Sequence, residues 1–210
     1  MTHSDRGLNL NDVWARVSEG IERIYRNEEM SPHAYMELYT HVCNYCTNTT
    51  AQAQPSRQSS RPAQKVGSNQ RQNTVHDGAN IGGDELYAEL KNYLKSYLEK
   101  ICEKEFDLQG EGLLRFYATN WEYYRFSSKV TNGFCHFLNR HRVRREYDSG
   151  RRDIYEIFTM AMEIWQLVFF QPLQSQVTLA CLQLINAERQ KETFNTRFIP
   201  YMSSLKLEFN

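Results

Sequence analysis

The sequence predicts an all-α protein, and three observations support this fold class. Apolar residues recur at helical spacing in one segment after another, as in the run Val13, Val17 and Ile21. No segment alternates apolar and polar residues in the manner of a half-buried β-strand. Serine, asparagine and aspartate residues precede several of the periodic segments, where helix N-caps belong.

Eight helices are expected, at about residues 11–26, 33–47, 84–104, 113–126, 129–146, 153–170 and 173–189 and from about 193 onwards. Asn9 or Asn11 is the expected N-cap of the first helix. Ser31 can cap the second helix, with Pro32 at the first helical position, where a missing N–H costs nothing. Asp84 is the expected N-cap of the third helix.

Three features indicate irregularities within this helical series. Gly20 lies inside the first helix at a cost of about 1 kcal/mol relative to alanine, which indicates close packing at that position. The pair Ser127-Ser128 predicts a kink or a new start between the fourth and fifth helices. Pro172 predicts the end of the sixth helix, because proline lacks the N–H that continues a helix.

The stretch from about residue 48 to 83 differs in composition from the rest of the chain. It has no aromatic residue and only one acidic residue, Asp77, among many Gln, Ser, Asn and Gly residues. Such a stretch cannot bury enough apolar surface to offset the entropy of ordering its backbone. The sequence therefore predicts a disordered insert between the second and third helices.

The bulk composition excludes several classes of protein. The 210 residues carry 25 basic and 25 acidic side chains, so no global field favours nucleic acid or an anionic membrane. The first residues lack the apolar run of a secretory signal, and no apolar stretch reaches the length of a membrane span. Five cysteines, an odd number, indicate reduced thiols. We expect a cytoplasmic and nuclear location.

The second predicted helix carries two apolar stripes side by side. Leu38, Val42 and Tyr45 recur at i, i+4 and i+7 and form the expected core face. A second stripe begins at Tyr35 and continues through Tyr39 and Cys43, with Met36 beside it. Two interpretations are open, because the helix could be buried between two neighbours or the second stripe could bind another protein. Tyrosine and methionine favour the second interpretation, because protein interfaces concentrate these residues.

Two clusters suggest other functions. Cys43 and Cys46 form a C-x-x-C pair, which suggests a metal or redox site, but no second ligand pair and no βαβ context accompany it. A dense basic cluster from Arg140 to Arg152 could contact nucleic acid phosphates, although a solvated face or an acidic protein partner fits a neutral chain better. No catalytic constellation is found, so we expect an interaction protein without enzymatic activity, metal or cofactor.

Several long, irregular strings resemble the cullin family, the elongated scaffolds of multisubunit ubiquitin ligases. They are YMELYTHVCNYCT at 35–47, WEYYRFSSKVTNGFCHFLNRHRVRRE at 121–146, RRDIYEIF at 151–158 and ERQKETFNTRFI at 188–199. The resemblance covers nearly the whole chain outside the insert and is strongest for the cullin of SCF-type ligases. It implies a five-helix cullin repeat at 1–147, including the insert, followed at 148–210 by the opening helices of a second repeat.

The resemblance also implies a partner and a binding site. The second and fifth helices of such a repeat would hold the substrate adaptor that carries F-box proteins. Carried over by position, the adaptor-binding residues are Tyr35, Met36, Tyr39, Thr40, Cys43, Asn44, Asn139, Arg142 and Val143, the last three forming an outer face of the fifth helix. At Cys43 and Arg142 the family pattern would have aromatic residues.

The family pattern continues beyond a chain of this length. The RING-recruiting C-terminal domain has no counterpart here, so the RING subunit is not expected to bind this fragment. A second repeat cut short would also leave apolar residues of the sixth and seventh helices exposed, which favours self-association. The residues expected to be exposed are Ile154, Ile157, Phe158, Met162, Trp165, Phe169, Val177 and Leu184.

Overall fold

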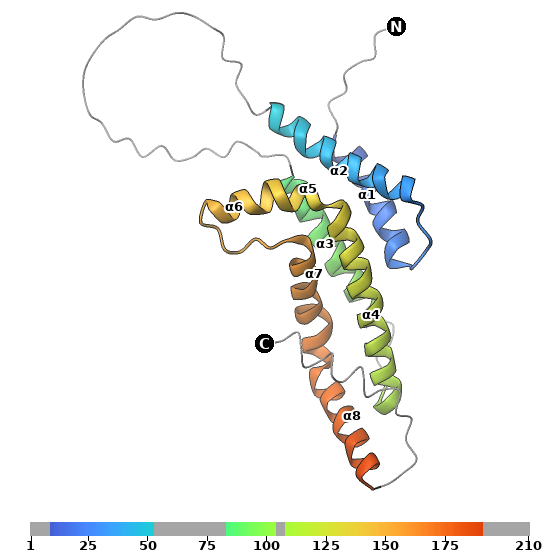
Figure 1. Cartoon of the computed structure of the whole chain (residues 1–210). Coiled ribbons are helices and arrows are strands. Elements are labelled where there is room, and N and C mark those ends of the chain that lie inside the picture. Colours follow the sequence, from blue (N-terminus) through green and yellow to red (C-terminus); the bar gives the residue numbers. More distant parts are fainter. Residues whose placement is uncertain (1–8, 53–82, 104–107, 191–210) are drawn as a thin grey trace, which may run out of the picture.

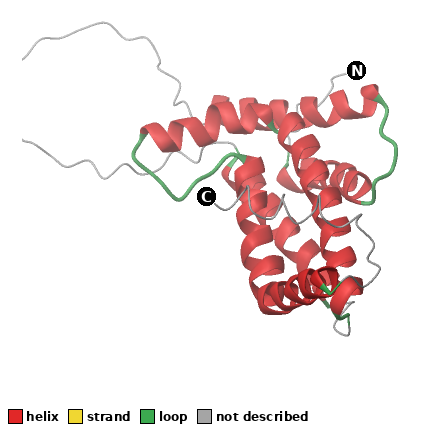
Figure 2. Cartoon of the chain, turned by 60° about the horizontal axis from the view of Figure 1, so that its bottom comes forward, coloured by secondary structure: helices red, strands yellow, loops and turns green. Residues whose placement is uncertain are grey.

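The computed structural model describes residues 9–52, 83–103 and 108–190, and within these ranges every regular element is helical (Figures 1 and 2). The all-α prediction is therefore confirmed. The expected insert lies almost entirely, and the expected eighth helix wholly, outside the described residues. The elements, with η for a π-helical segment, are α1 (Leu10–Tyr25), α2 (Pro32–Gln52), α3 (Asp84–Cys102), α4 (Gly110–Phe134), α5 (His136–Leu138), η1 (Asn139–Val143), α6 (Arg144–Asp148), α7 (Ile157–Ile164), η2 (Trp165–Phe170) and α8 (Gln171–Arg189).

Helices α1 and α2 begin where the capping signals predict. The N–H of Asn11 donates to Asn9 Oδ1 at 3.3 Å, and the N–H of Ala34 donates to Ser31 Oγ at 3.2 Å. For α3 the prediction is off by one residue, because Asp84 is the first helical residue and Gly83 precedes it. Asp84 still stabilises this end of α3, since a negative charge in the first turn opposes the helix dipole.

Ser127 and Ser128 do not break α4, which runs unbroken from Gly110 to Phe134. Both serines are buried and are used in contacts with α1. Ser127 Oγ donates to the carbonyl of Ile24, in the last turn of α1, at 3.1 Å. Ser128 Oγ donates to the carbonyl of Tyr124 and lies 3.0 Å from the hydroxyl of Tyr25. The predicted new start is therefore wrong, because both serines lie within one continuous helix and join it to α1.

Pro172 does not end a helix either, since α7, η2 and α8 follow one another without a gap. A proline inside a helix leaves the carbonyl four residues earlier without its usual donor and clashes with it. Here that carbonyl belongs to Val168, in the π-helical segment η2, and it accepts from Cys102 Sγ of α3 at 3.7 Å. The wider turn and this outside donor explain how the helix continues past Pro172.

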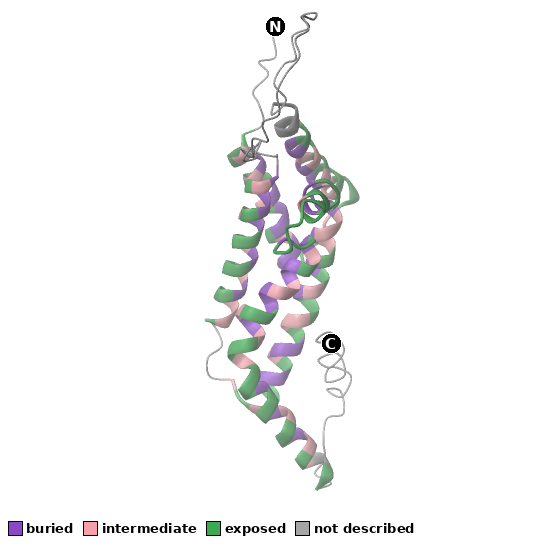
Figure 3. Ribbon diagram, turned by 90° about the vertical axis from the view of Figure 1, so that its left-hand side faces the viewer, coloured by how far each residue is buried: buried purple, intermediate pink, exposed green. Residues whose placement is uncertain are grey.

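The helices form two connected groups. Helix α4 lies along α7, η2 and α8, with α3 packed against the same run, and α1 and α2 pack together at the other end of α4 (Figure 1). Gly20 permits this last contact, because a Cβ there would lie 2.5 Å from Leu38, which confirms the close packing that the sequence indicates. Buried positions line the spaces between the helices (Figure 3).

The second half of the chain is part of this core. Trp165 and Phe169 are completely buried, and so is Ile157. The Trp165 ring lies 5.6 Å from Tyr117 and 5.2 Å from Tyr124, both on α4, between ring centroids. The residues expected to be exposed at 154–184 are instead buried or half-buried, because α3 and α4 cover them. The division into two cullin repeats near residue 147 stays a prediction.

Candidate binding face on α2

Helix α2 divides into a core face and a partly exposed face, as its two stripes predict. Leu38, Val42 and Tyr45 are 6%, 0% and 3% exposed, so the predicted core stripe is confirmed. Tyr35, Tyr39 and Cys43 are only half-buried, and Met36 is 54% exposed. Thr40 and Asn44 complete the outer surface. These six residues, Tyr35, Met36, Tyr39, Thr40, Cys43 and Asn44, are called the α2 face below.

Tyr35 fixes the position of the α2 face over the C-terminal end of α4. Its ring meets Phe134 edge-on, with ring centroids 6.2 Å apart. Its hydroxyl lies over Gly133, where even an alanine Cβ would come within 2.3 Å of the oxygen. Partial burial raises the pKa of Tyr35, so the phenol is neutral at physiological pH. Tyr35 therefore anchors the α2 face, while Met36 and Tyr39 remain available to a partner.

A second wall comes from the helical run that begins at α5, which packs against α2 (Figure 1). There the ring of Phe137 stacks on His141, with centroids 4.1 Å apart and an interplanar angle of 28°. His141 is exposed and Phe137 is half-buried. Neither is among the residues that the family resemblance implies, although a spacing of four residues places two rings on one side of a helix.

Asn139, Arg142 and Val143 do not form an outer face, because the structure leaves only 6%, 7% and 6% of them exposed. Asn139 Oδ1 accepts from the N–H of Ile157 at 2.9 Å, and its Nδ2 donates to Asn132 Oδ1 at 2.8 Å. Asn132 Oδ1 also accepts from the N–H of Phe158 at 3.1 Å. These amides pair with the first N–H groups of α7, which have no partner within the helix. Asn139 thus holds α7 in place, and its contact with a partner stays a prediction.

Arg142 connects η1 to the start of α3. Its Nε donates to Asp84 Oδ1 in a close ion pair. Its guanidinium lies over the ring of Tyr87, 4.2 Å from the centroid. The hydroxyl of Tyr87 in turn donates to the carbonyl of Tyr155 at 2.9 Å. Arg142 is thus a buried cation that is paired and stacked inside this chain.

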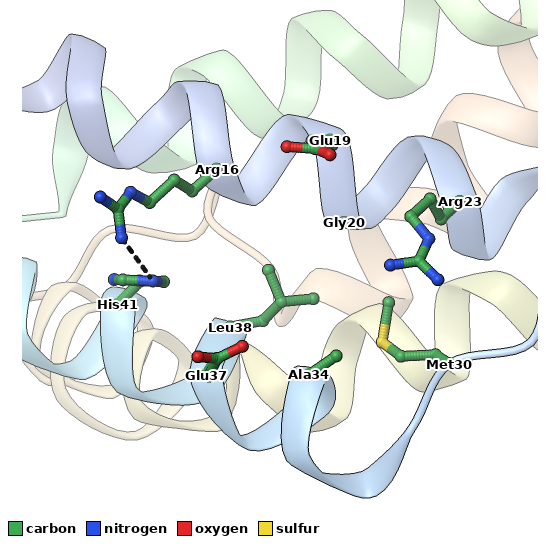
Figure 4. A pocket seen from close by; sticks show the side chains of 9 residues that line it. All are labelled: Arg16, Glu19, Gly20, Arg23, Met30, Ala34, Glu37, Leu38 and His41. Carbon is green, nitrogen blue, oxygen red and sulfur yellow. Dashed lines mark hydrogen bonds between the residues drawn. The ribbon is translucent and has the colours of Figure 1, made fainter.

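A cavity of about 290 Å³ lies on the other flank of α2, between α1 and α2 (Figure 4). Gly20, Ala34 and Leu38 form part of its lining. The charged residues around it are of both signs, with Arg16 and Arg23 on α1 and Glu19 and Glu37 also on its wall. Arg16 Nη1 lies 3.5 Å from His41 Nε2. Such a mixed lining selects neither anions nor cations, so the α2 face is the better candidate for binding.

The comparisons with known proteins identify the family. Residues 14–207 match the family model of the cullin alpha solenoid domain. The chain belongs to the cullin family. It is 39% identical over 193 residues to Cullin-1 of Caenorhabditis elegans and 32% identical over 200 residues to Cullin-1 of Dictyostelium discoideum. It is 29% identical over 194 residues to Cell division control protein 53 of Saccharomyces cerevisiae.

These matches cover most of this cullin chain but only part of each relative. They include 89%, 94% and 83% of the chain, and 23%, 24% and 22% of the three relatives in the same order. The chain therefore spans about a quarter of the length of the curated cullins that it matches. The family and the solenoid fold follow from these matches.

Cys46, the second cysteine of the C-x-x-C pair of this cullin, is a buried thiol. Burial raises the pKa of Cys46 to about 12, so its thiol stays protonated and unreactive at neutral pH. Burial also raises the pKa of Cys135, which neighbours Cys46. In the described part of the chain, no group of three or more His, Cys, Asp or Glu side chains is placed to hold a metal ion.

Among the described helices, none is long and apolar enough to span a membrane.

Proposed function

We propose that this cullin segment is the adaptor-binding part of an SCF-type ubiquitin-ligase scaffold and has no catalytic role of its own. The α2 face, together with the neighbouring rings of Phe137 and His141, holds the adaptor that carries F-box proteins. Binding of the RING subunit is not assigned to these residues. Similarity to Cullin-1 of two organisms supports the scaffold role.

The observation that carries the proposal is the partly exposed aromatic and methionine surface beside a fully buried stripe on one helix. A helix that only supports its own core needs one apolar stripe. Helix α2 has a second stripe, and the chain leaves Met36 54% exposed and Tyr39 partly exposed. Aromatic residues and methionine are enriched where proteins bind one another. Within the α2 face, Tyr39 lies between Tyr35 and Cys43, so we expect it near the centre of the contact.

The test is the affinity of Tyr39→Ala for an adaptor in complex with an F-box protein, measured by isothermal titration calorimetry. We expect binding to weaken by about 2 kcal/mol, roughly 30-fold, as for a central tyrosine of an interface. The melting temperature should change little, because Tyr39 is only half-buried.

Two control variants separate binding from folding. Tyr123→Ala removes another tyrosine, 51% exposed on α4, and should leave affinity unchanged. Leu38→Ala removes a core side chain and should lower the free energy of unfolding by about 2–5 kcal/mol, with affinity per folded molecule retained. If Tyr39→Ala unfolds the protein and the folded fraction binds normally, Tyr39 belongs to the core and the assignment fails.

A further inference from the structure

Half of the six arginines in the basic cluster at 140–152 pair with acidic side chains of the same chain. Arg142 is paired with Asp84, and Arg151 lies 3.2 Å from Glu146 and 3.3 Å from Asp153. Arg145 lies 3.9 Å from Glu146. Arg152 places its guanidinium over the ring of Tyr147, 4.2 Å from the centroid.

Three arginines of the cluster have no acidic partner among the described residues, and one of them, Arg152, is stacked on Tyr147. Within the described residues, neither Arg140 nor Arg144 forms an ion pair, and both are exposed. Together with the exposed His136, they follow one another at i, i+4 and i+8 along the run α5, η1 and α6. Side chains at this spacing share one face of a helix. The row is called the arginine edge below and is defined by His136, Arg140 and Arg144.

The arginine edge does not stabilise the helix that carries it. Like charges at i and i+4 destabilise a helix by about 0.2–0.5 kcal/mol. The helix dipole favours cations in the last turn, but Arg140 lies eight residues before Asp148, where the run ends. Arg140 therefore gains little from its own chain, whereas Arg144 lies four residues before Asp148, about one turn from the end of the run. An external anionic group would neutralise both charges.

The arginine edge lies on the same helical run as the wall of the proposed adaptor site. Phe137 and His141 each directly follow a member of the edge in the sequence, and the run packs against α2 through α5. A protein seated on the α2 face and on Phe137 therefore reaches Arg140 within about one helical turn, 5.4 Å. The centre of this surface is apolar and one margin is basic, which is the usual arrangement of a protein interface.

Nucleic acid fits the arginine edge less well than protein does. The chain has no net charge, so it lacks the long-range field that attracts polyanions. Neutralising about two phosphates gives only a weak, salt-sensitive affinity. A carboxylate pair on a protein partner instead matches two guanidinium groups one turn apart.

We infer that the adaptor presents carboxylates to Arg140 and Arg144, and that this contact steers the adaptor onto the α2 face. The inference rests on the proposed function and names the chemistry of the partner at that site. Charges at the margin of an interface act mainly on the association rate and its salt dependence. The apolar contacts of the α2 face then determine how slowly the complex dissociates.

The experiment measures association and dissociation rates of the same adaptor complex by surface plasmon resonance. The variant is Arg140→Glu with Arg144→Glu, and Arg140→Gln with Arg144→Gln is an intermediate. The matched control, Lys95→Glu with Lys100→Glu, has the same net charge change on exposed positions of α3. These lysines lie 11 and 16 residues after Asp84, roughly 17–24 Å along the helix. Circular dichroism melting checks that every variant is folded.

The glutamate variant should associate about tenfold more slowly than the control at about 0.05 M salt. The difference should shrink to less than about threefold at about 0.5 M salt, because screening shortens the range of the charges. The glutamine variant should lie between them, and dissociation rates should stay within about twofold.

Three results would overturn the inference, and they are distinguishable. If the wild-type chain does not bind the adaptor, the proposed function fails and the inference with it. If the wild type binds and the glutamate variant associates at the rate of the control, only the inference fails. If a short DNA duplex binds the wild type and not the glutamate variant, while adaptor rates are unchanged, the arginine edge serves nucleic acid instead.

Discussion

Trp165 offers the sharpest test of whether the two halves of the chain form one core. Its side chain is completely buried and stacks on Phe169 with ring centroids 4.1 Å apart. The rings of Tyr117, Trp121 and Tyr124 on α4 surround it at 5.2–5.6 Å. Its Nε1–H donates to the hydroxyl of Tyr117 at 3.2 Å. Trp165→Ala removes all of these contacts at once.

We expect Trp165→Ala to lower the free energy of unfolding by about 3–5 kcal/mol, as for other buried aromatic residues replaced by alanine. The lost hydrogen bond and ring contacts place the change toward the upper end of that range. For a chain of this size each kcal/mol lowers the melting temperature by about 2–4 °C, so the expected decrease is roughly 10–20 °C. Leu167→Ala is the matched control in the same segment, because Leu167 is 61% exposed, and it should change stability by less than about 0.5 kcal/mol.

Urea unfolding followed by circular dichroism and by tryptophan fluorescence provides the assay. Trp14 of α1 lies edge-on to Tyr93 of α3, at the far end of the bundle. With Trp121 replaced by phenylalanine in both proteins, Trp14 is the remaining tryptophan of the variant, and its emission reports that end. In the variant, both signals should shift together to lower urea with an unchanged m-value. The single-core interpretation is wrong if the Trp14 fluorescence keeps its wild-type urea midpoint while part of the circular dichroism signal is lost at lower urea. In that case the helices from α7 to α8 form a separate folding unit.

Two further predictions follow from the same packing. A chain ending at Asp148 should scatter more light and bind more of an apolar dye than the full chain at equal concentration. The reason is that it exposes the faces of Tyr117 and Tyr124 that α7 and η2 bury. Equal scattering and equal dye binding would contradict the contacts of Trp165. Native protein treated with iodoacetamide at about pH 8 should remain unmodified at Cys46, because a pKa of about 12 leaves almost no thiolate. Unfolding in urea should make Cys46 reactive. Modification of Cys46 in the native protein, located by peptide mass spectrometry, would contradict its burial.

Local signals in the sequence predict most of the helices and the core face of α2. Val42 is fully buried, as its place in the stripe with Leu38 requires, and Asn9 and Ser31 cap the helices that follow them. These features depend only on residues within one or two turns of one another. A helical period and a cap residue can therefore be read directly from the sequence.

The helix breaks could not be predicted in this way, because the effect of a helix-breaking residue depends on a distant partner. Ser127 leaves α4 unbroken because the carbonyl of Ile24, 103 residues earlier, accepts its hydroxyl proton. Pro172 is tolerated inside a helix because Cys102, on α3, lies beside the carbonyl of Val168. Local propensity predicts an interruption in both places, and a tertiary contact outweighs it.

The two halves of the predicted binding site differ for a related reason. On α2 the outer residues carry rings and a thioether, and the chain leaves them partly exposed, as at Met36. On η1 a helical wheel places the polar residues Asn139 and Arg142 on the outer face, but the structure buries them because their partners are also polar. Asn139 accepts a hydrogen bond from the N–H of Ile157, and Arg142 donates to Asp84, 58 positions earlier. A helical wheel separates polar from apolar faces, but it cannot distinguish water from a buried hydrogen-bonding partner. Arg140 and Arg144 are exposed on this run whereas Arg142 is buried, so the adaptor contact that we propose falls on the exposed pair.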